Sequence, residues 1–315
     1  MSVLLFFIDG LGIGSRGPHN PLDGLEAAEP LAVFQNEAAA MVFDGLVIPT
    51  DACLGVSGRP QSASGQTTIL TGINAPARLG YHKQGFPNAA LREIILEHSI
   101  FRQLGEAGIA PVTFANTYTQ RFFEDRPRWV SATTVAVEAA GLTFHTLDDL
   151  KAGRALYQDF TNGLLIARGE DVAARTPDEA AEVLAAITAA HHFTLYEYFI
   201  TDKMGHAQNM ADARSVILNL AAMIRALLGK LDLDRTTVIL TSDHGNIEDL
   251  STRNHTLNAI PTIVWGAHRQ RVANRIHCLA DITPAILGIL AAKGTAKGTA
   301  TDGQPGRTDC ERDAN

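Results

Sequence analysis

The chain lacks the features that a nucleic-acid binder, a disulfide-held protein or a membrane protein would need. Its 315 residues contain 26 Lys and Arg against 34 Asp and Glu, so no basic excess is available to neutralise nucleic-acid phosphates. Its three cysteines form no CxxC pair, which argues against a disulfide framework or a thiolate zinc site. No apolar run approaches the ~20 residues of a membrane span.

The apolar N-terminus has no basic segment before it and runs directly into Asp9. It is therefore too short and wrongly flanked for a secretory signal, and it predicts a buried first strand. We expect a cytoplasmic protein that binds neither nucleic acid nor membrane.

What the chain does contain is enough apolar sequence for a large core. Hydrophobic residues make up 46% of it and charged residues only 19%, a composition that fits an ordered globular protein. Short apolar runs alternate with helical patterns, and this alternation predicts an α/β fold: a doubly wound, mostly parallel sheet with helices on both faces. The expected strands are 3–9, 110–115, 194–201, 236–240 and 261–265, and the clearest expected helices are 99–107, 177–190, 211–228 and 282–291.

Two segments depart from this rhythm. Residues 116–160 combine arginines with aromatic residues, and we interpret them as a short lid or reduced cap over the site. Residues 293–315 consist of small and charged residues without a large apolar side chain, which predicts a disordered tail. The expected organisation is one catalytic domain, 1–292, followed by that tail.

Metal-ligating residue types follow three of the predicted strands. Ligands of open α/β sheets bind at the carboxyl ends of the strands, so these side chains are expected to meet there. Each residue alone is as easily explained as a turn or capping residue, and the hypothesis depends on their recurrence. Three carboxylates and three imidazoles suit two divalent cations. The strand-end candidates are Asp9, Asp202, Asp243 and His244, and the loop candidates are His206 and His255.

A Ser-rich segment, 58–68, precedes a predicted helix start. Backbone N–H groups at a helix N-terminus favour a bound anion, and a serine beside a divalent metal can act as a nucleophile. An ordinary capping loop is the alternative interpretation of this segment.

Together these pieces resemble the alkaline phosphatase superfamily, in particular the branch of cofactor-independent phosphoglycerate mutase and phosphopentomutase. The resemblance covers residues 1–80 and 195–290, through the motifs FFIDGLGIG, PQSASGQTT, TDKMGH, TSDHGNIED and NHTLNAIPT. It implies two Mn²⁺ or Zn²⁺ ions and a nucleophilic Ser62, with Ser64 as the alternative. One metal would be held by Asp202, His206 and His255, and the other by Asp9, Asp243, His244 and the Ser62 hydroxyl.

The chain also departs from that branch. The mutases carry a large inserted domain between nucleophile and DxxxH element, whereas only 140 residues separate Ser62 from Asp202. The lysine that the mutases place against the phosphate has no counterpart in 159–168.

A short lid favours transfer to water. We therefore expect a phosphoric-ester hydrolase acting on a small phosphorylated substrate through phospho-Ser62, with a phosphomutase as the alternative. Retention of every metal residue and of the serine argues against a third possibility, a catalytically inactive binding protein. Guanidinium groups match phosphate oxygens, although a solvated basic turn would look the same in sequence. The candidate substrate-binding residues are Arg59, Arg121, Arg126 and Arg128.

Overall fold

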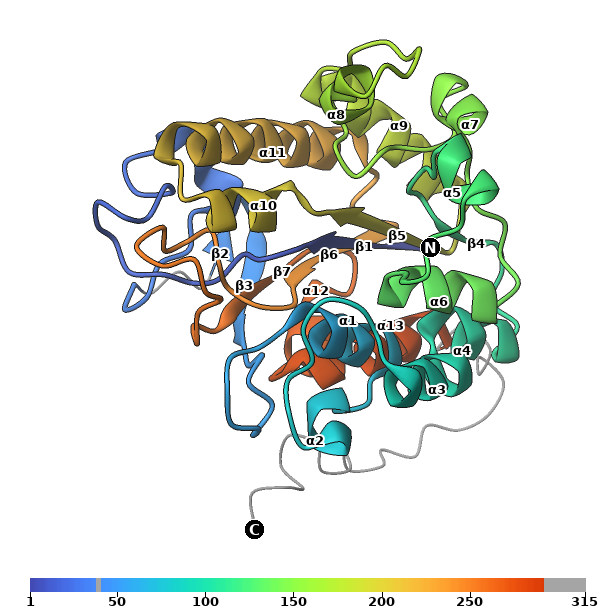
Figure 1. Ribbon diagram of the computed structural model, residues 1–315, viewed down its shortest axis with the longest axis horizontal. Helices are drawn as coiled ribbons and strands as arrows, with labels where there is room; N and C mark the ends of the chain where they lie inside the picture. The colour runs from blue at the N-terminus through green and yellow to red at the C-terminus, as the bar shows by residue number, and fades with distance from the viewer. Residues whose placement is uncertain (38–40, 292–315) are drawn as a thin grey trace.

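A seven-stranded sheet runs through the centre of the computed structural model, which describes residues 1–37 and 41–291 (Figure 1). The strand order is β2-β3-β7-β6-β1-β5-β4. The strands are β1 (Ser2–Ile8), β2 (Met41–Val42), β3 (Gly45–Thr50), β4 (Val112–Phe114), β5 (Phe193–Tyr198), β6 (Thr236–Ser242) and β7 (Ile260–Gly266).

The sheet is mixed. β1 pairs in parallel with β5 and β6, and β4 pairs in parallel with β5. β7 runs antiparallel to β6 and β3, and β3 runs antiparallel to β2. The predicted doubly wound α/β class is confirmed, but the antiparallel β2–β3–β7 end makes the sheet less parallel than expected. The β2–β3 hairpin went unpredicted because β2 is two residues long and the short apolar run of β3, 46–48, is bounded by Gly45 and Pro49, which weaken a strand pattern.

Helices cover both faces of the sheet (Figure 1). On one face, Leu4, Phe6 and Ile8 of β1 pack in one buried cluster with α9 and α11. The alternate residues of β1 pack toward the helices of the other face, as the two-residue period of a strand requires. The first layer contains η1 (Glu26–Leu31), α9 (Pro177–Ala190) and α11 (Met210–Lys230), and the second contains α1 (Ser62–Thr71), α3 (Ala89–His98), α4 (Ile100–Glu106), α6 (Ala132–Ala139) and α13 (Ile282–Leu290).

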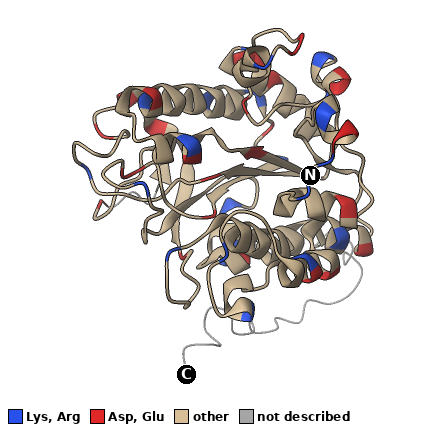
Figure 2. Ribbon diagram, viewed as in Figure 1, with Lys and Arg blue, Asp and Glu red and all other residues tan. Residues whose placement is uncertain are grey.

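Shorter helices complete the described chain. They are α2 (Ala75–Leu79), α5 (Gln120–Glu124), α7 (Leu147–Lys151), α8 (Gly163–Ala167), α10 (Ile200–Ala207), α12 (Arg269–Ala273) and η2 (Leu279–Asp281). None of the helices in the described ranges is both long and apolar enough to cross a membrane. Basic and acidic residues are intermixed along the outer helices and loops, and the central strands carry few of either (Figure 2).

The segment 116–160, which the sequence assigns to a lid or cap, divides into two parts. Helix α6 is buried and packs against α1 and α3 within the second layer. Helix α5 has no buried residue, and the chain from it to Ser131 borders a cavity described below. The predicted tail, 293–315, lies outside the described residues.

Candidate metal centre

The six candidate metal ligands converge at the carboxyl ends of three adjacent strands. Asp9 directly follows β1, and Asp243 and His244 directly follow β6. The sequence predicts a strand up to Asp202, but β5 ends at Tyr198 and Asp202 lies in the first turn of α10. An acidic residue in a first turn is stabilised by the helix dipole.

Helix α10 also carries His206, which the sequence placed in a loop. A spacing of four residues puts Asp202 and His206 on the same face of the helix, and His206 Nε2 lies 3.4 Å from Asp202 Oδ2. His206 Nε2 is also 3.3 Å from His255 Nε2. The DxxxH spacing is therefore a helical pair directed at one point.

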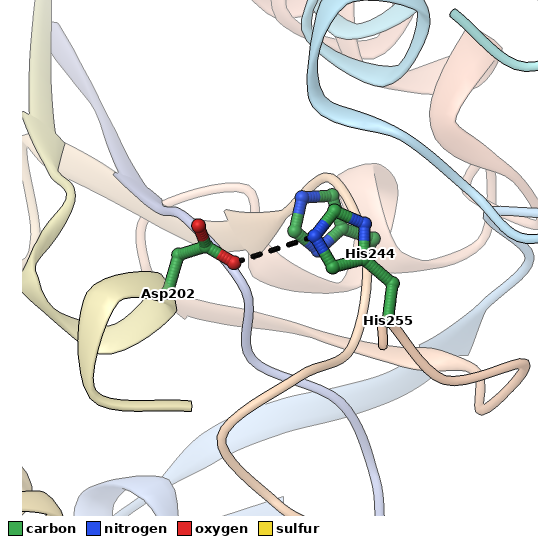
Figure 3. A group of neighbouring side chains, drawn as sticks. All are labelled: Asp202, His244 and His255. Carbon is green, nitrogen blue, oxygen red and sulfur yellow. Dashed lines mark ion pairs between the residues drawn. The ribbon is translucent and has the colours of Figure 1, made fainter. Parts of the chain in front are cut away.

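One group of potential ligands consists of Asp202, His244 and His255, whose ligand atoms lie within 4.8 Å of one another (Figure 3). Asp202 Oδ1 is 3.5 Å from His255 Nε2. The two imidazole rings are stacked, with centroids 3.6 Å apart and planes 13° from parallel. His255 Nδ1 bonds the carbonyl of Pro60 at 3.0 Å, which directs Nε2 toward the centre.

A second group consists of Asp9, Asp243 and His244, again with ligand atoms within 4.8 Å. His244 Nε2 lies 3.3 Å from Asp9 Oδ1 and 3.5 Å from Asp243 Oδ2. His244 therefore belongs to both groups. The two sets of ligands expected from the sequence adjoin each other in one centre, with His206 and His255 on one side and Asp9 and Asp243 on the other.

Burial sets the electrostatics of this centre. Burial, followed by the negative charges of Asp243 and Asp202, raises the pKa of Asp9 well above its ordinary value. Burial also raises the pKa of Asp243 well above its ordinary value, with a further contribution from Asp202. Burial lowers the pKa of His244 and of His255, so both imidazoles are neutral and keep a lone pair for a metal.

The donor set fits divalent cations. Among the described residues, no Lys or Arg pairs with Asp9, Asp202 or Asp243, whose only ion-pair partners are histidines. Asp9 Oδ1 is buried and receives no hydrogen bond, which is costly for a carboxylate oxygen without a compensating positive charge. Carboxylate and imidazole are ligands for Mn²⁺ and for Zn²⁺ alike.

Three supporting residues were missed from the sequence. Gln66 Nε2 donates to Asp243 Oδ2 at 3.3 Å, and Asn246 Nδ2 donates to Asp202 Oδ1 at 2.6 Å. Buried Glu248 accepts hydrogen bonds from the backbone N–H of Gly12 (2.9 Å) and of Asn246 (2.7 Å). Partners of this kind fix the orientation of metal ligands. The only available signal was their position inside the SGQTT and DHGNIED motifs.

Ser62 faces the metal centre. It is the first residue of α1, and its Oγ lies 3.1 Å from His244 Nε2. Ser64 is fully buried, donates to the Gln61 carbonyl and accepts from the Lys83 N–H. The geometry therefore brings Ser62, and not Ser64, to the candidate ligands.

The candidate substrate-binding arginines lie in two places. Arg121, Arg126 and Arg128 line a cavity of about 750 Å³ at the carboxyl ends of β4 and β5, whereas Arg59 does not line it. Arg126 pairs with Glu138, and the Arg128 guanidinium lies 5.1 Å from the ring centroid of Trp129.

Comparisons with known proteins concern the family and the fold. Residues 170–294 match the family model of the metalloenzyme superfamily. A 2,3-bisphosphoglycerate-independent phosphoglycerate mutase of Antithamnion sp. is 31% identical over 109 residues, a match that covers 32% of this chain and 21% of the mutase.

Two solved structures resemble the fold over most of the chain. A Pyrococcus horikoshii protein has a TM-score of 0.52 and 11% identity, over 95% of this chain and 99% of that one. A cold-active alkaline phosphatase of Shewanella sp. has a TM-score of 0.50 and 10% identity, over 92% of this chain and 100% of that one. At such identities the likeness concerns the fold alone.

Proposed function

We propose that the chain is a phosphoric-ester hydrolase that acts through a phosphoserine at Ser62; the match of residues 170–294 to the metalloenzyme superfamily model and the alkaline phosphatase-like fold support this. One observation carries the proposal: the Ser62 hydroxyl lies 3.1 Å from His244, the residue shared by both groups of candidate ligands. A serine in this position places a nucleophile beside residues that would hold a divalent cation, the source of positive charge that covalent phosphoryl transfer requires.

The candidate ligands would hold two divalent cations, Mn²⁺ or Zn²⁺. When bound, such ions lower the pKa of a neighbouring hydroxyl and offset the charge on transferring phosphoryl oxygens. Asp202, His206 and His255 would hold one ion, and Asp9, Asp243 and the Ser62 hydroxyl the other, with His244 between them.

The chain itself supplies the nucleophile and the orientation. Ser62 Oγ attacks the phosphorus of a bound monoester, the ester P–O bond breaks, and the alcohol leaves with a proton. Water then attacks the phosphoserine, which releases inorganic phosphate and restores the Ser62 hydroxyl. The N-terminus of α1 favours the phosphoryl anion.

Transfer to water is favoured over transfer back to an alcohol by the small size of the segment over the site. A mutase must keep its phosphoserine from water until the alcohol rebinds. Here α6 packs within the second layer, and the exposed segment from α5 to Ser131, which borders the cavity, is short. A phosphomutase is the second candidate, supported by the match to the Antithamnion mutase.

The test is phosphate release from a panel of monoesters with added Mn²⁺ or Zn²⁺, followed by product analysis with phosphorus NMR. We expect inorganic phosphate as the product and a phosphoryl group on the peptide that contains Ser62 after rapid acid quenching. Ser62→Ala should abolish turnover while bound metal is retained, because Asp9, Asp243 and His244 remain.

The matched control is Ser57→Ala, an exposed serine in the loop that precedes α1, which should retain turnover. If the product is an isomerised phosphate ester and no inorganic phosphate is released, the hydrolase proposal is wrong and the protein is a mutase. Full turnover by Ser62→Ala would exclude Ser62 as the nucleophile.

A further inference from the structure

We infer that the alcohol part of the substrate is a ring-bearing group of nucleoside size, held by aromatic side chains in the cavity beside the metal centre. The inference rests on the proposed function and names the substrate class of the same site.

The cavity adjoins the metal centre along the sheet edge. Its lining includes Glu197 and Phe199 at the end of β5, and β5 lies directly beside β1. Glu197 of β5 is paired with Phe7 of β1, and Phe7 lies two residues before Asp9. The spacing between strands and the rise along β1 therefore place the Cα atoms of Glu197 and Asp9 about 8 Å apart. The ring of Phe199 also contacts that of Phe7, with centroids 6.2 Å apart. The cavity and the metal centre therefore lie on neighbouring strands at the same end of the sheet.

The far wall of the cavity lies beyond the reach of a small ester. This wall is formed by the chain that follows β4. β4 is the second strand from β1 in the sheet order, so the two strands lie about 10 Å apart. The cavity volume of about 750 Å³ is in the range of pockets that enclose ligands of several rings. A three-carbon phosphate ester held at the metal centre would leave most of this space to water.

Aromatic rings dominate the apolar part of the wall. Tyr118 and Phe122 both line the cavity, with centroids 4.5 Å apart. Tyr118 is held by a hydrogen bond between its hydroxyl and Thr134 (2.8 Å) and by ring contact with Phe144 (4.5 Å). Fixed rings of this kind offer stacking surfaces to a planar ligand group. They match a nucleobase better than a sugar or a carboxylic acid.

The charges of the wall are consistent with a ligand carrying a single phosphate. Arg126 is occupied by Glu138 and lies over the Phe122 ring, 5.5 Å from its centroid. Arg128 lies over Trp129. Two of the three lining arginines are thus engaged by the protein itself, and a second anionic group on the alcohol would find only Arg121.

The experiment measures kcat/KM of the full chain with Mn²⁺ for adenosine 5′-monophosphate, glycerol 3-phosphate, 3-phosphoglycerate and p-nitrophenyl phosphate. We expect the nucleotide to exceed glycerol 3-phosphate at least tenfold. Phe122→Leu should lower kcat/KM for the nucleotide at least fivefold, mainly through KM, and leave glycerol 3-phosphate unchanged. Phe123→Leu is the matched control, since Phe123 is the neighbouring ring on α5, is 45% exposed and does not line the cavity.

Failure of the inference and failure of the proposed function are distinguishable. Equal or faster hydrolysis of glycerol 3-phosphate, or an equal effect of Phe122→Leu on all esters, would overturn the inference and leave the hydrolase. If no ester releases phosphate, the hydrolase proposal is wrong, and the binding of adenosine 5′-monophosphate is then measured by calorimetry. Binding that Phe122→Leu weakens would support the ligand class without the hydrolase activity. Absence of binding would overturn the inference.

Discussion

Glu197 is a buried carboxyl that the metal centre does not use. Its side chain is 2% exposed, lines the cavity and accepts a hydrogen bond from Thr133. Burial raises the pKa of Glu197 from 4.5 to about 8. The folded protein therefore holds Glu197 protonated at neutral pH, whereas the unfolded chain releases the proton.

This difference predicts a pH-dependent effect of Glu197→Gln. Because the folded pKa is the higher one, the wild type loses stability as pH rises from about 4.5 to about 8; glutamine cannot ionise and avoids this loss. The variant should match the wild type at pH 5 and exceed its free energy of unfolding by about 3 kcal/mol or more at pH 8. Urea unfolding at both pH values measures this.

The control is Glu182→Gln, on an exposed part of α9, which should show a constant difference from the wild type between the two pH values. If the Glu197→Gln difference is equally constant, the carboxyl is ionised in the folded protein and the assignment is wrong.

Helix α10 holds its ligands in place through close packing on the loop after β6. A Cβ atom on Gly205 would lie 2.5 Å from the side chain of Asn246, and Asn246 is fully buried and bonded to Asp202. Glycine at 205 therefore allows the close approach that positions Asp202 and His206.

Gly205→Ala should push α10 away from Asn246. We expect a loss of about 1–3 kcal/mol in the free energy of unfolding and at least a tenfold fall in turnover, because the hydrogen bond that orients Asp202 is broken. Gly105→Ala is the matched change in α4, where a Cβ meets nothing within 4 Å, and it should stabilise by about 0.5–1 kcal/mol. Similar thermal unfolding and turnover for the two variants would show that the packing at Gly205 has no such role.

The elements that could be predicted from the sequence are those with a strong local pattern. Thr176, Pro177 and Glu179 form the N-terminal signature of α9, and the structure has the complete capping box. Buried β1 is a continuous apolar run after its first residue, and β6 has an apolar centre, 238–240. The turn at Phe199 that ends β5 before Asp202 has no glycine or proline to mark it, so the predicted strand ran too far.

The convergence of the candidate ligands could be predicted because strand ends carry a positional rule. The supporting bonds of Gln66 and Glu248 could not, because they depend on contacts between segments as much as 236 residues apart. Likewise, nothing in the sequence indicated that Arg126 is occupied by Glu138.

At the scale of the whole molecule, the metal centre joins segments from opposite ends of the chain. Asp9 comes from the first strand and His255 from the loop before β7, and His244 lies between the two ligand groups. Metal binding should therefore contribute to global stability by stabilising the folded state selectively.

Mn²⁺ added to metal-free protein should raise the thermal midpoint of unfolding. Each occupied site should add about 2.7 kcal/mol to the free energy of unfolding when the free Mn²⁺ concentration is a hundredfold above Kd. His206→Ala and His244→Ala should each lose one ion and part of the gain, because a neutral imidazole has a single lone pair and can ligate one ion. Metal analysis and calorimetry on the same samples measure this. The control is His98→Ala, on α3 with a side chain 47% exposed; full metal content in His244→Ala would contradict its role as a ligand.

The register of β1 also governs the order of events during synthesis on the ribosome. Its two neighbours begin at Phe193 and Thr236, so the first strand waits for more than half of the chain to be translated. At 5–20 residues per second this delay is roughly 10–40 s. During that time Val3–Ile8 has no strand partner in the nascent chain, so this apolar segment is exposed to aggregation until β5 and β6 are made.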